Sequence, residues 1–299
     1  MEARADLGRI RAISEDLRKQ VFEKIELRGI AVFLVGASRA APYSLRDALR
    51  RELSGRRYIL GFDVYYPEEL FEELLTGSQK GDLLELENML ARSVHAVVIL
   101  LESPGAIAEL GAFANHAELQ DKLVVVVDKK YLRKKSFIML GPVAHLRKRT
   151  KSQVIYFDFR RGDIEKLGED VRSAVRRVSK DVRVDNTVRN PIAAQHYLRA
   201  AIHAFAPVSR DTLFHVVKVA DVAEEEDVET RLNTSLSILG RQGEVMLAGQ
   251  KYSLTTAGRR RLHTMLRLEP SGKAIQDALD QVRLKVMTWT LRRPTKLAV

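Results

Sequence analysis

Residues 97–118, VVILLESPGAIAELGAFANHAE, contain the pattern that decides the fold. They begin with a run of β-branched and other apolar residues, typical of a buried strand, and continue with a segment of helical length. Ser103 is suited to the N-cap of that helix, and Pro104 to its first position. Gly105 allows a ligand to approach the helix N-terminus closely. The stretch therefore predicts a strand that leads directly into a helix over 104–120.

The same alternation of strand and helix recurs through the first two thirds of the chain. Short apolar, β-branched runs occupy 29–37, 58–66, 95–101, 122–128 and 153–159, and helical patterns occupy 44–54, 67–75, 81–92, 104–120 and 163–180. Buried runs separated by helix-length segments indicate a parallel sheet covered on both faces. We therefore predict an α/β fold with a doubly wound, mostly parallel five-stranded sheet.

The rest of the chain reads differently, and we expect four parts in all. Apolar residues at helical spacing over about 4–28 predict a long amphipathic N-terminal helix. From about residue 196 the pattern changes to three short helices and a hairpin. The predicted parts are the helix at 1–28, the α/β domain at 29–185, a small helix-and-hairpin domain at 196–268, and a helix and tail at 272–299.

Composition excludes several classes of protein. The 299 residues include no cysteine, so disulfides and thiolate sites are excluded. No apolar run approaches the ~20 residues of a membrane span, and the N-terminus lacks the apolar core of a signal peptide. The seven histidines show no metal-ligand spacing, and phosphate-loop and hydrolase-elbow motifs are missing. We expect a cytoplasmic protein without a membrane segment, a metal or a resident cofactor.

The net charge of +11 is concentrated in the middle of the chain. Residues 128–195 contain 18 basic and 8 acidic side chains, and the stretch from Lys129 to Lys151 contains nine basic side chains and no acid. Such a run is either a solvated loop or a phosphate-binding surface. The second interpretation predicts nucleic-acid contacts from Lys129, Lys130, Lys134, Lys135, Arg147, Lys148 and Arg149.

Glu109 is the strongest candidate for a functional residue. Its neighbours within PGAIAELGAFA are apolar residues, Gly and Pro, and a carboxylate there risks losing its water. In an open parallel sheet the ligand lies beyond the carboxyl ends of the strands, where the strand order reverses. For the order 2-1-3-4-5, that position lies between LVGASRA after the first strand and LLESPGAIAE after the third. Glu109 is therefore expected in the binding crevice.

Several other residues are candidates for binding the substrate. Gly36, Ser38 and Arg39 follow the first strand and offer backbone N–H groups and polar side chains, although an ordinary strand–helix turn explains them equally well. Tyr66, Pro67 and Glu68 follow the second strand at the same mouth. Asp82 and Glu85 begin the helix before the third strand, where favourable charge at a helix N-terminus is the simpler explanation. The predicted substrate-binding set is Gly36, Ser38, Arg39, Tyr66, Asp82, Ser103 and Gly105.

The block ESPGAIAELGAF resembles the nucleophile motif of nucleoside 2-deoxyribosyltransferases. Glu109 matches the catalytic glutamate of that family, and Gly105 matches its glycine. The family's acid six positions before the glutamate is replaced here by Ser103, with Glu102 beside it. The resemblance implies glycosidic-bond chemistry at Glu109 without fixing the nucleoside.

Three longer blocks resemble the toxic effectors of retron anti-phage systems. They are GFDVYYPEELFEELL, DLLELENMLARSVHAVVILLESPGAIAELGAFAN and DKKYLRKKSFIMLGPV. The resemblance implies a deoxyribosyltransferase-like N-glycosidase followed by a winged-helix domain, with a reverse transcriptase and its multicopy single-stranded DNA as partners. It also implies a nucleotide substrate, with NAD favoured, and a homo-oligomer or higher-order assembly.

The residues themselves leave other functions open. A non-enzymatic nucleotide sensor with a DNA-binding domain and a nucleoside-monophosphate phosphoribohydrolase are both compatible with the motifs. In the helix-and-hairpin domain, the third helix would present side chains to DNA, but the preceding DVAEEEDVE is acidic, so DNA contact and protein docking stay equally open. The candidate reading residues are Arg231, Asn233, Thr234, Ser237 and Arg241. Beyond them, Ile275, Leu279, Val282, Val286 and Trp289 share one helical face, which indicates packing or a partner seam.

Overall fold

A computed structural model describes most of the chain and divides it into two units. The described residues are 2–25, 30–37, 44–54, 62–66, 68, 93–185, 187–220 and 225–292. One unit contains the described residues from Ile30 to Val184, and the other contains residues 2–25 together with those from Asp185 onward. Ser38, Arg39 and Asp82 lie outside the described residues, as do the helices predicted at 67–75 and 81–92 apart from Glu68.

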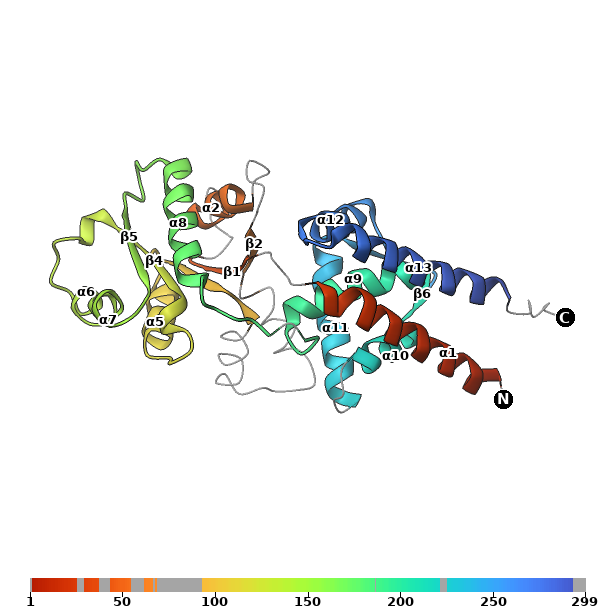
Figure 1. The fold of residues 1–299 in the computed structure, drawn as a ribbon. Coiled ribbons are helices and arrows are strands. Elements are labelled where there is room, and N and C mark those ends of the chain that lie inside the picture. Colours follow the sequence, from red (N-terminus) through yellow and green to blue (C-terminus); the bar gives the residue numbers. More distant parts are fainter. Residues whose placement is uncertain are drawn as a thin grey trace. The chain divides into compact units, whose positions relative to one another are not determined.

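The first unit is built on a five-stranded parallel sheet (Figure 1). The strands lie in the order β2-β1-β3-β4-β5, and every neighbouring pair is parallel. They are β1 (Ile30–Val35), β2 (Phe62–Tyr65), β3 (Ala96–Leu100), β4 (Leu123–Asp128) and β5 (Gln153–Phe157). The predicted parallel sheet and its strand order are confirmed. The order reverses between β1 and β3, as expected.

Helices cover both faces of this sheet. On one face, α2 (Leu45–Ser54) and α8 (Ile164–Ser179) pack on alternate strand residues such as Val98 and form one buried cluster with them. Strand side chains alternate between faces, so Val97 and Ile99 point to the other side. There α5 (Pro104–Ala114) packs against β3 and α7 (Pro142–Arg149), and α7 packs against β5. The sheet is therefore buried on both faces, which explains its continuous β-branched runs.

Two helical segments of the first unit differ from the sequence prediction. The helix after β3 ends at Ala114 instead of 120, because Asn115 caps it and the chain then turns back towards β4. The basic stretch contains α6 (Phe137–Leu140) as well as α7. Val143 and Leu146 of α7 are buried, so this apolar pair holds a basic helix against the sheet.

The second unit is helical around a central buried helix. It contains α1 (Glu2–Asp16), which continues as a π turn and a 3-10 turn to Lys24, and then α9 (Pro191–Phe205), α10 (Arg210–Ala220), α11 (Glu225–Arg241), α12 (Thr256–Leu268) and α13 (Gly272–Leu291). A small antiparallel sheet has the order β6-β8-β7, with β6 (Val208–Ser209), β7 (Val245–Ala248) and β8 (Lys251–Leu254). Nearly every residue of α9 is buried. The N-terminal helix belongs to this unit rather than standing apart from it.

The apolar face of α13 packs inside the chain. Ile275, Leu279, Val282 and Val286 are buried in the same cluster as residues of α1 and α9, and Trp289 packs against it. The Trp289 indole N–H also donates to Asp6 of α1 at 3.3 Å. The stripe seen in the sequence is therefore an internal packing face.

Candidate active site

The N-terminus of α5 is formed as the sequence predicts. Ser103 has extended backbone angles, and its Oγ accepts a hydrogen bond from the N–H of Ala106 at 3.2 Å, while Pro104 takes the first helical position. This cap fixes the direction in which α5 leaves the carboxyl end of β3. Ser103 is engaged in the cap, and Gly105 beside it is exposed.

Glu109 lies one and a half turns into α5 and is half-buried. Among the described residues, none donates a hydrogen bond to its carboxylate. Burial and, after it, the charge of Glu68 raise the pKa of Glu109 to about 6 against the opposing charge of Arg46. Within the described part of the chain, Glu109 is thus a carboxylate that loses water without gaining a hydrogen-bond donor. Its pKa depends on the charges of Arg46 in α2 and Glu68 after β2.

Arg46 places a buried positive charge at this site. Its side chain is 3% exposed, and its guanidinium forms an ion pair with Glu68, which follows β2. The Arg46 Nε atom is buried and has no hydrogen-bond partner in the described part of the chain. A buried guanidinium costs free energy unless it is paired, so the pair with Glu68 and the nearby Glu109 together account for its position.

Tyr66 supports Arg46 from the end of β2. The guanidinium carbons of Arg46 and Arg50 each lie 4.3 Å from the centroid of the Tyr66 ring. The Tyr66 hydroxyl donates to the Asp47 carboxylate, and burial, with that hydrogen bond, raises the pKa of Tyr66 to about 12. Tyr66 is fully buried, so it orients the arginines of α2 and does not present its hydroxyl to the crevice.

Gly36 and Glu102 join the ends of β1 and β3. The Glu102 Oε1 atom accepts a hydrogen bond from the N–H of Ala37 at 3.0 Å. A Cβ atom at Gly36 would lie 2.8 Å from Glu102 Oε1 and 3.2 Å from the Arg46 Cδ atom. Glycine at this position therefore lets Arg46 and Glu102 approach the end of β1 closely, and Glu102 holds the two strand ends together.

The basic residues predicted to bind nucleic acid fall into two groups. Lys129, Lys130, Lys134 and Lys135 follow the carboxyl end of β4, where Lys130 pairs with Asp128 at 3.0 Å. Arg147, Lys148 and Arg149 form the last turn of α7, which precedes the amino end of β5. The length of a six-residue strand, about 20 Å, separates the two edges of a parallel sheet. The structure thus does not bring the seven residues together on one surface.

The residues predicted to read DNA are largely engaged inside the second unit. Thr234 is buried, and the Asn233 side chain accepts a hydrogen bond from Arg210 of α10 at 2.9 Å. Arg231 is partly buried, and its Nη2 atom lies 3.8 Å from the Oδ2 atom of Asp227. Of the five candidates, Asn233 and Arg241 are exposed, and Arg231 and Ser237 are partly exposed.

The site as a whole combines three features: a poorly solvated carboxylate, a second carboxylate whose charge acts on it, and a buried arginine paired to that second carboxylate. Such a carboxylate can stabilise a developing positive charge or bond to an electrophilic carbon. Arg46 was not among the residues predicted for this site, although its position in the sequence carried a signal. Arg46 lies on the same stripe of α2 as Leu49 and Leu53, where an apolar residue is expected.

Among the residues that the structure describes, no group of three or more potential metal ligands occurs together. No helix among them is both long enough and apolar enough to cross a membrane.

Known proteins resemble this chain over most of its length. Residues 42–246, which include Arg46 and Glu109, match the family described as "STM3845 retron effector protein". The "Retron Ec86 putative ribosyltransferase/DNA-binding protein" of Escherichia coli is 28% identical over 277 residues, covering 88% of this chain and 86% of that protein. The retron Ec73 protein of the same name, also from Escherichia coli, is 33% identical over 114 residues, covering 38% of this chain and 36% of that protein.

Proposed function

The chain belongs to the STM3845 retron effector protein family, and we propose that it is an N-glycosidase whose catalytic carboxylate is Glu109. The observation that carries the proposal is the state of Glu109: half-buried, without a described hydrogen-bond donor, with its pKa raised to about 6, at the carboxyl edge where the strand order reverses. The two Escherichia coli relatives bear names that include ribosyltransferase, which is compatible with chemistry at the same kind of bond.

The chemistry requires a negative charge at the anomeric carbon. When a glycosidic C–N bond breaks, both electrons leave with the base nitrogen, and the sugar carbon becomes oxocarbenium-like. The Glu109 carboxylate would stabilise this carbon electrostatically or bond to it. Water would then add to the same carbon, release one proton and, in the second case, displace the carboxylate with its bonding electrons. At neutral pH a pKa of about 6 keeps Glu109 mostly ionised, as either role requires.

We propose NAD as the favoured substrate, and the state of Glu68 supports this choice. The nicotinamide of NAD is already cationic and leaves as a neutral base, so it needs no general acid, whereas purine and pyrimidine bases usually do. Glu68 accepts a charge-assisted hydrogen bond from Arg46, which holds it as an acceptor rather than a proton donor. Gly36 and Gly105, with Ser38, Arg39 and Asp82 outside the described residues, stay our candidates for binding the substrate.

The second unit supports a proposal about partners. Its order of helix, short strand, two helices and antiparallel hairpin is compatible with a winged helix, the domain that we propose for it. Because Thr234 is buried and Asn233 is bonded to Arg210, α11 is better suited to docking a protein than to reading bases. We propose that a reverse transcriptase and its single-stranded DNA hold this toxic effector in check, within a homo-oligomer or larger assembly.

The proposal is tested by measuring base release. The purified chain, alone and with its reverse transcriptase and DNA, is incubated with NAD, nucleotides and deoxynucleotides, and the products are separated by chromatography. We expect nicotinamide and ADP-ribose from NAD. If no state of the protein releases a base from any of these substrates, the chain is not an N-glycosidase, and the nucleotide-sensor alternative replaces the proposal.

A further inference from the structure

The amino edge of the sheet in the first unit carries a concentration of basic side chains on the opposite side from Glu109. This edge is where β3, β4 and β5 begin. The last turn of α7 lies there because β5 follows it closely. The last turns of α8 lie there too, because α8 runs back from the end of β5 and packs against the 3-10 turn Gln120–Lys122 that precedes β4.

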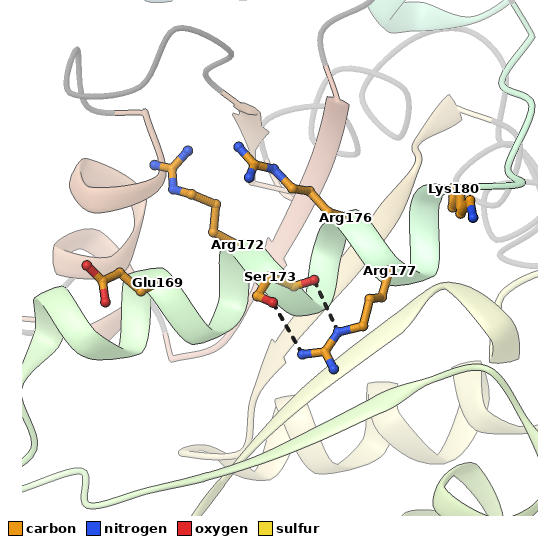
Figure 2. A pocket seen from close by; sticks show the side chains of 6 residues that line it. All are labelled: Glu169, Arg172, Ser173, Arg176, Arg177 and Lys180. Carbon is orange, nitrogen blue, oxygen red and sulfur yellow. Dashed lines mark hydrogen bonds between the residues drawn. The ribbon is translucent and has the colours of Figure 1, made fainter.

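A groove runs along the exposed face of α8 towards this edge. It has a volume of about 620 Å³, and its described lining consists of Glu169, Arg172, Ser173, Arg176, Arg177 and Lys180. Figure 2 shows that these side chains all project from α8, with Arg172 and Arg176 on the same side of the helix. Four of the six are cationic, and all six are polar. This described lining suits a ligand with repeated negative charges, and it includes no aromatic side chain on which a base could stack.

The four basic residues of the groove differ in how strongly the protein already engages them. Arg172 is buried, and its Nη2 atom donates to the backbone carbonyls of Glu52 and Leu53 at 2.7 and 3.0 Å, so it mainly anchors the end of α2. Arg177 bonds within its own helix to Ser173. Arg176 and Lys180 are exposed. The groove therefore presents three cations that can move to meet a ligand above one fixed arginine.

Contacts join the ends of α7 and α8 into one surface. Lys151, just after α7, forms an ion pair at 3.4 Å with Asp181, just after α8, and its backbone N–H donates to Asp121 at 3.0 Å. The acids at this edge include Asp121 and Asp181, both facing Lys151, and Glu118, whose charge acts on Lys122, together with Glu169 at the far end of the groove. Cations outnumber them, so the surface keeps an excess of positive charge.

We infer that the amino-edge surface, made of Arg147, Lys148, Arg149, Arg176, Arg177 and Lys180, binds the sugar–phosphate backbone of a nucleic acid strand. The amino-edge surface rests on the nucleic-acid partner in the proposed function and changes the residues assigned to that contact. It includes residues of α8 and excludes Lys129, Lys130, Lys134 and Lys135. Arginine guanidinium groups match phosphate oxygens in geometry as well as charge. Because the surface lies about one strand length, about 20 Å, from the carboxyl edge, a bound strand does not cover Glu109.

The test compares two triple variants that lose the same charge. The probe is fluorescently labelled oligodeoxythymidylate, and its affinity for the full chain is measured by anisotropy over a range of salt concentrations. One variant is Arg176→Ala/Arg177→Ala/Lys180→Ala at the amino edge, and the matched control is Lys129→Ala/Lys134→Ala/Lys135→Ala at the carboxyl edge. All six residues are exposed, and melting curves check that both variants fold.

The amino-edge variant should bind more weakly and depend less on salt. The slope of log affinity against log salt should fall by roughly 2, since each single-strand phosphate contact contributes about 0.7. The control should keep the wild-type slope. The double variant Arg176→Lys/Arg177→Lys keeps both charges, so it should retain most of the binding that the alanine variant loses. Equal weakening in both triples, an unchanged amino-edge variant, or no binding by the wild type would each overturn the inference. None of these outcomes bears on base release, which tests the glycosidase separately.

Discussion

Glu109→Gln should make the protein more stable at neutral pH, and the size of the gain follows from the surroundings of the carboxylate. Burial and the Glu68 charge raise the pKa of Glu109 from 4.5 to about 6 in the folded protein. Each unit of pKa shift corresponds to about 1.4 kcal/mol, so ionised Glu109 costs the folded state about 2 kcal/mol. A neutral glutamine of nearly the same shape removes that cost.

The sign of the effect changes predictably with pH. Between pH 4.5 and about 6 the folded protein binds the Glu109 proton more tightly than the unfolded chain does, so stability falls as pH rises through this window. Glu109→Gln should therefore gain about 1–2 kcal/mol at pH 7.5 and nothing at pH 4.

Urea denaturation at the two pH values measures this difference. Circular dichroism follows both units, whereas fluorescence of Trp289, the single tryptophan, follows the second unit alone and gives an internal reference. Asp170→Asn, which changes an exposed carboxylate of α8, is the matched control and should shift neither transition. The reasoning is refuted if Glu109→Gln is no more stable than the wild type at pH 7.5, or if its gain persists at pH 4.

Three further predictions concern other charged groups. Glu68→Gln removes a charge that raises the pKa of Glu109 and frees Arg46 to approach it. The acidic limb of the kcat/KM profile should therefore move from about pH 6 to lower pH. An unmoved limb with lower activity would mean that Glu68 has a purely structural role. His95 accepts a hydrogen bond at Nδ1 from the N–H of Ala31, and burial lowers its pKa from 6.5 to about 4. Between pH 6.5 and about 4 the unfolded chain therefore binds a proton at His95 that the folded protein does not. Up to about 3 kcal/mol of the free energy of unfolding is lost as pH falls through this range. His95→Asn, which keeps the acceptor, should be less acid-sensitive in urea titrations at pH 7 and pH 4.5, and equal sensitivity would contradict this assignment. Arg199 is 1% exposed and pairs with Glu244. Arg199→Met should therefore lower the free energy of unfolding by about 3–5 kcal/mol, and Arg199→Met/Glu244→Leu should recover most of this loss. A double variant as unstable as the single one would show that packing, not the unpaired charge, causes the loss.

The sheet could be predicted from the sequence because its physical signal is strong and local. Strands such as LVVVVD at 123–128 are buried on both faces, so their apolar residues are consecutive and their limits are visible. The cap at Ser103 and Pro104 was equally visible, because it depends on adjacent residues. Glu109 could be placed near the carboxyl ends of the strands once the strand order was assumed, because the helix that carries it begins directly after β3.

Other features depend on contacts between distant segments and were therefore missed. Arg46 is read in the sequence as one polar residue of a surface helix, and its role appears only when the end of β2 brings Glu68 beside it. The basic stretch from Lys129 to Lys151 looked continuous, but α6 and α7 carry the chain from one edge of the sheet to the other. Thr234 was one candidate for contacting DNA if α11 binds it, and the packing of α11 buries this side chain.

The most direct test of the central claim is nicotinamide and ADP-ribose release from NAD by wild type, Glu109→Gln and Asp170→Asn in the triggered or assembled state. Removing the charge of a catalytic carboxylate costs on the order of 10²–10³ in rate, and more if it is a nucleophile. We predict that Glu109→Gln stays folded by its melting curve but loses activity by at least this factor, while Asp170→Asn cleaves like the wild type. Cleavage by Glu109→Gln at the wild-type rate would contradict the account.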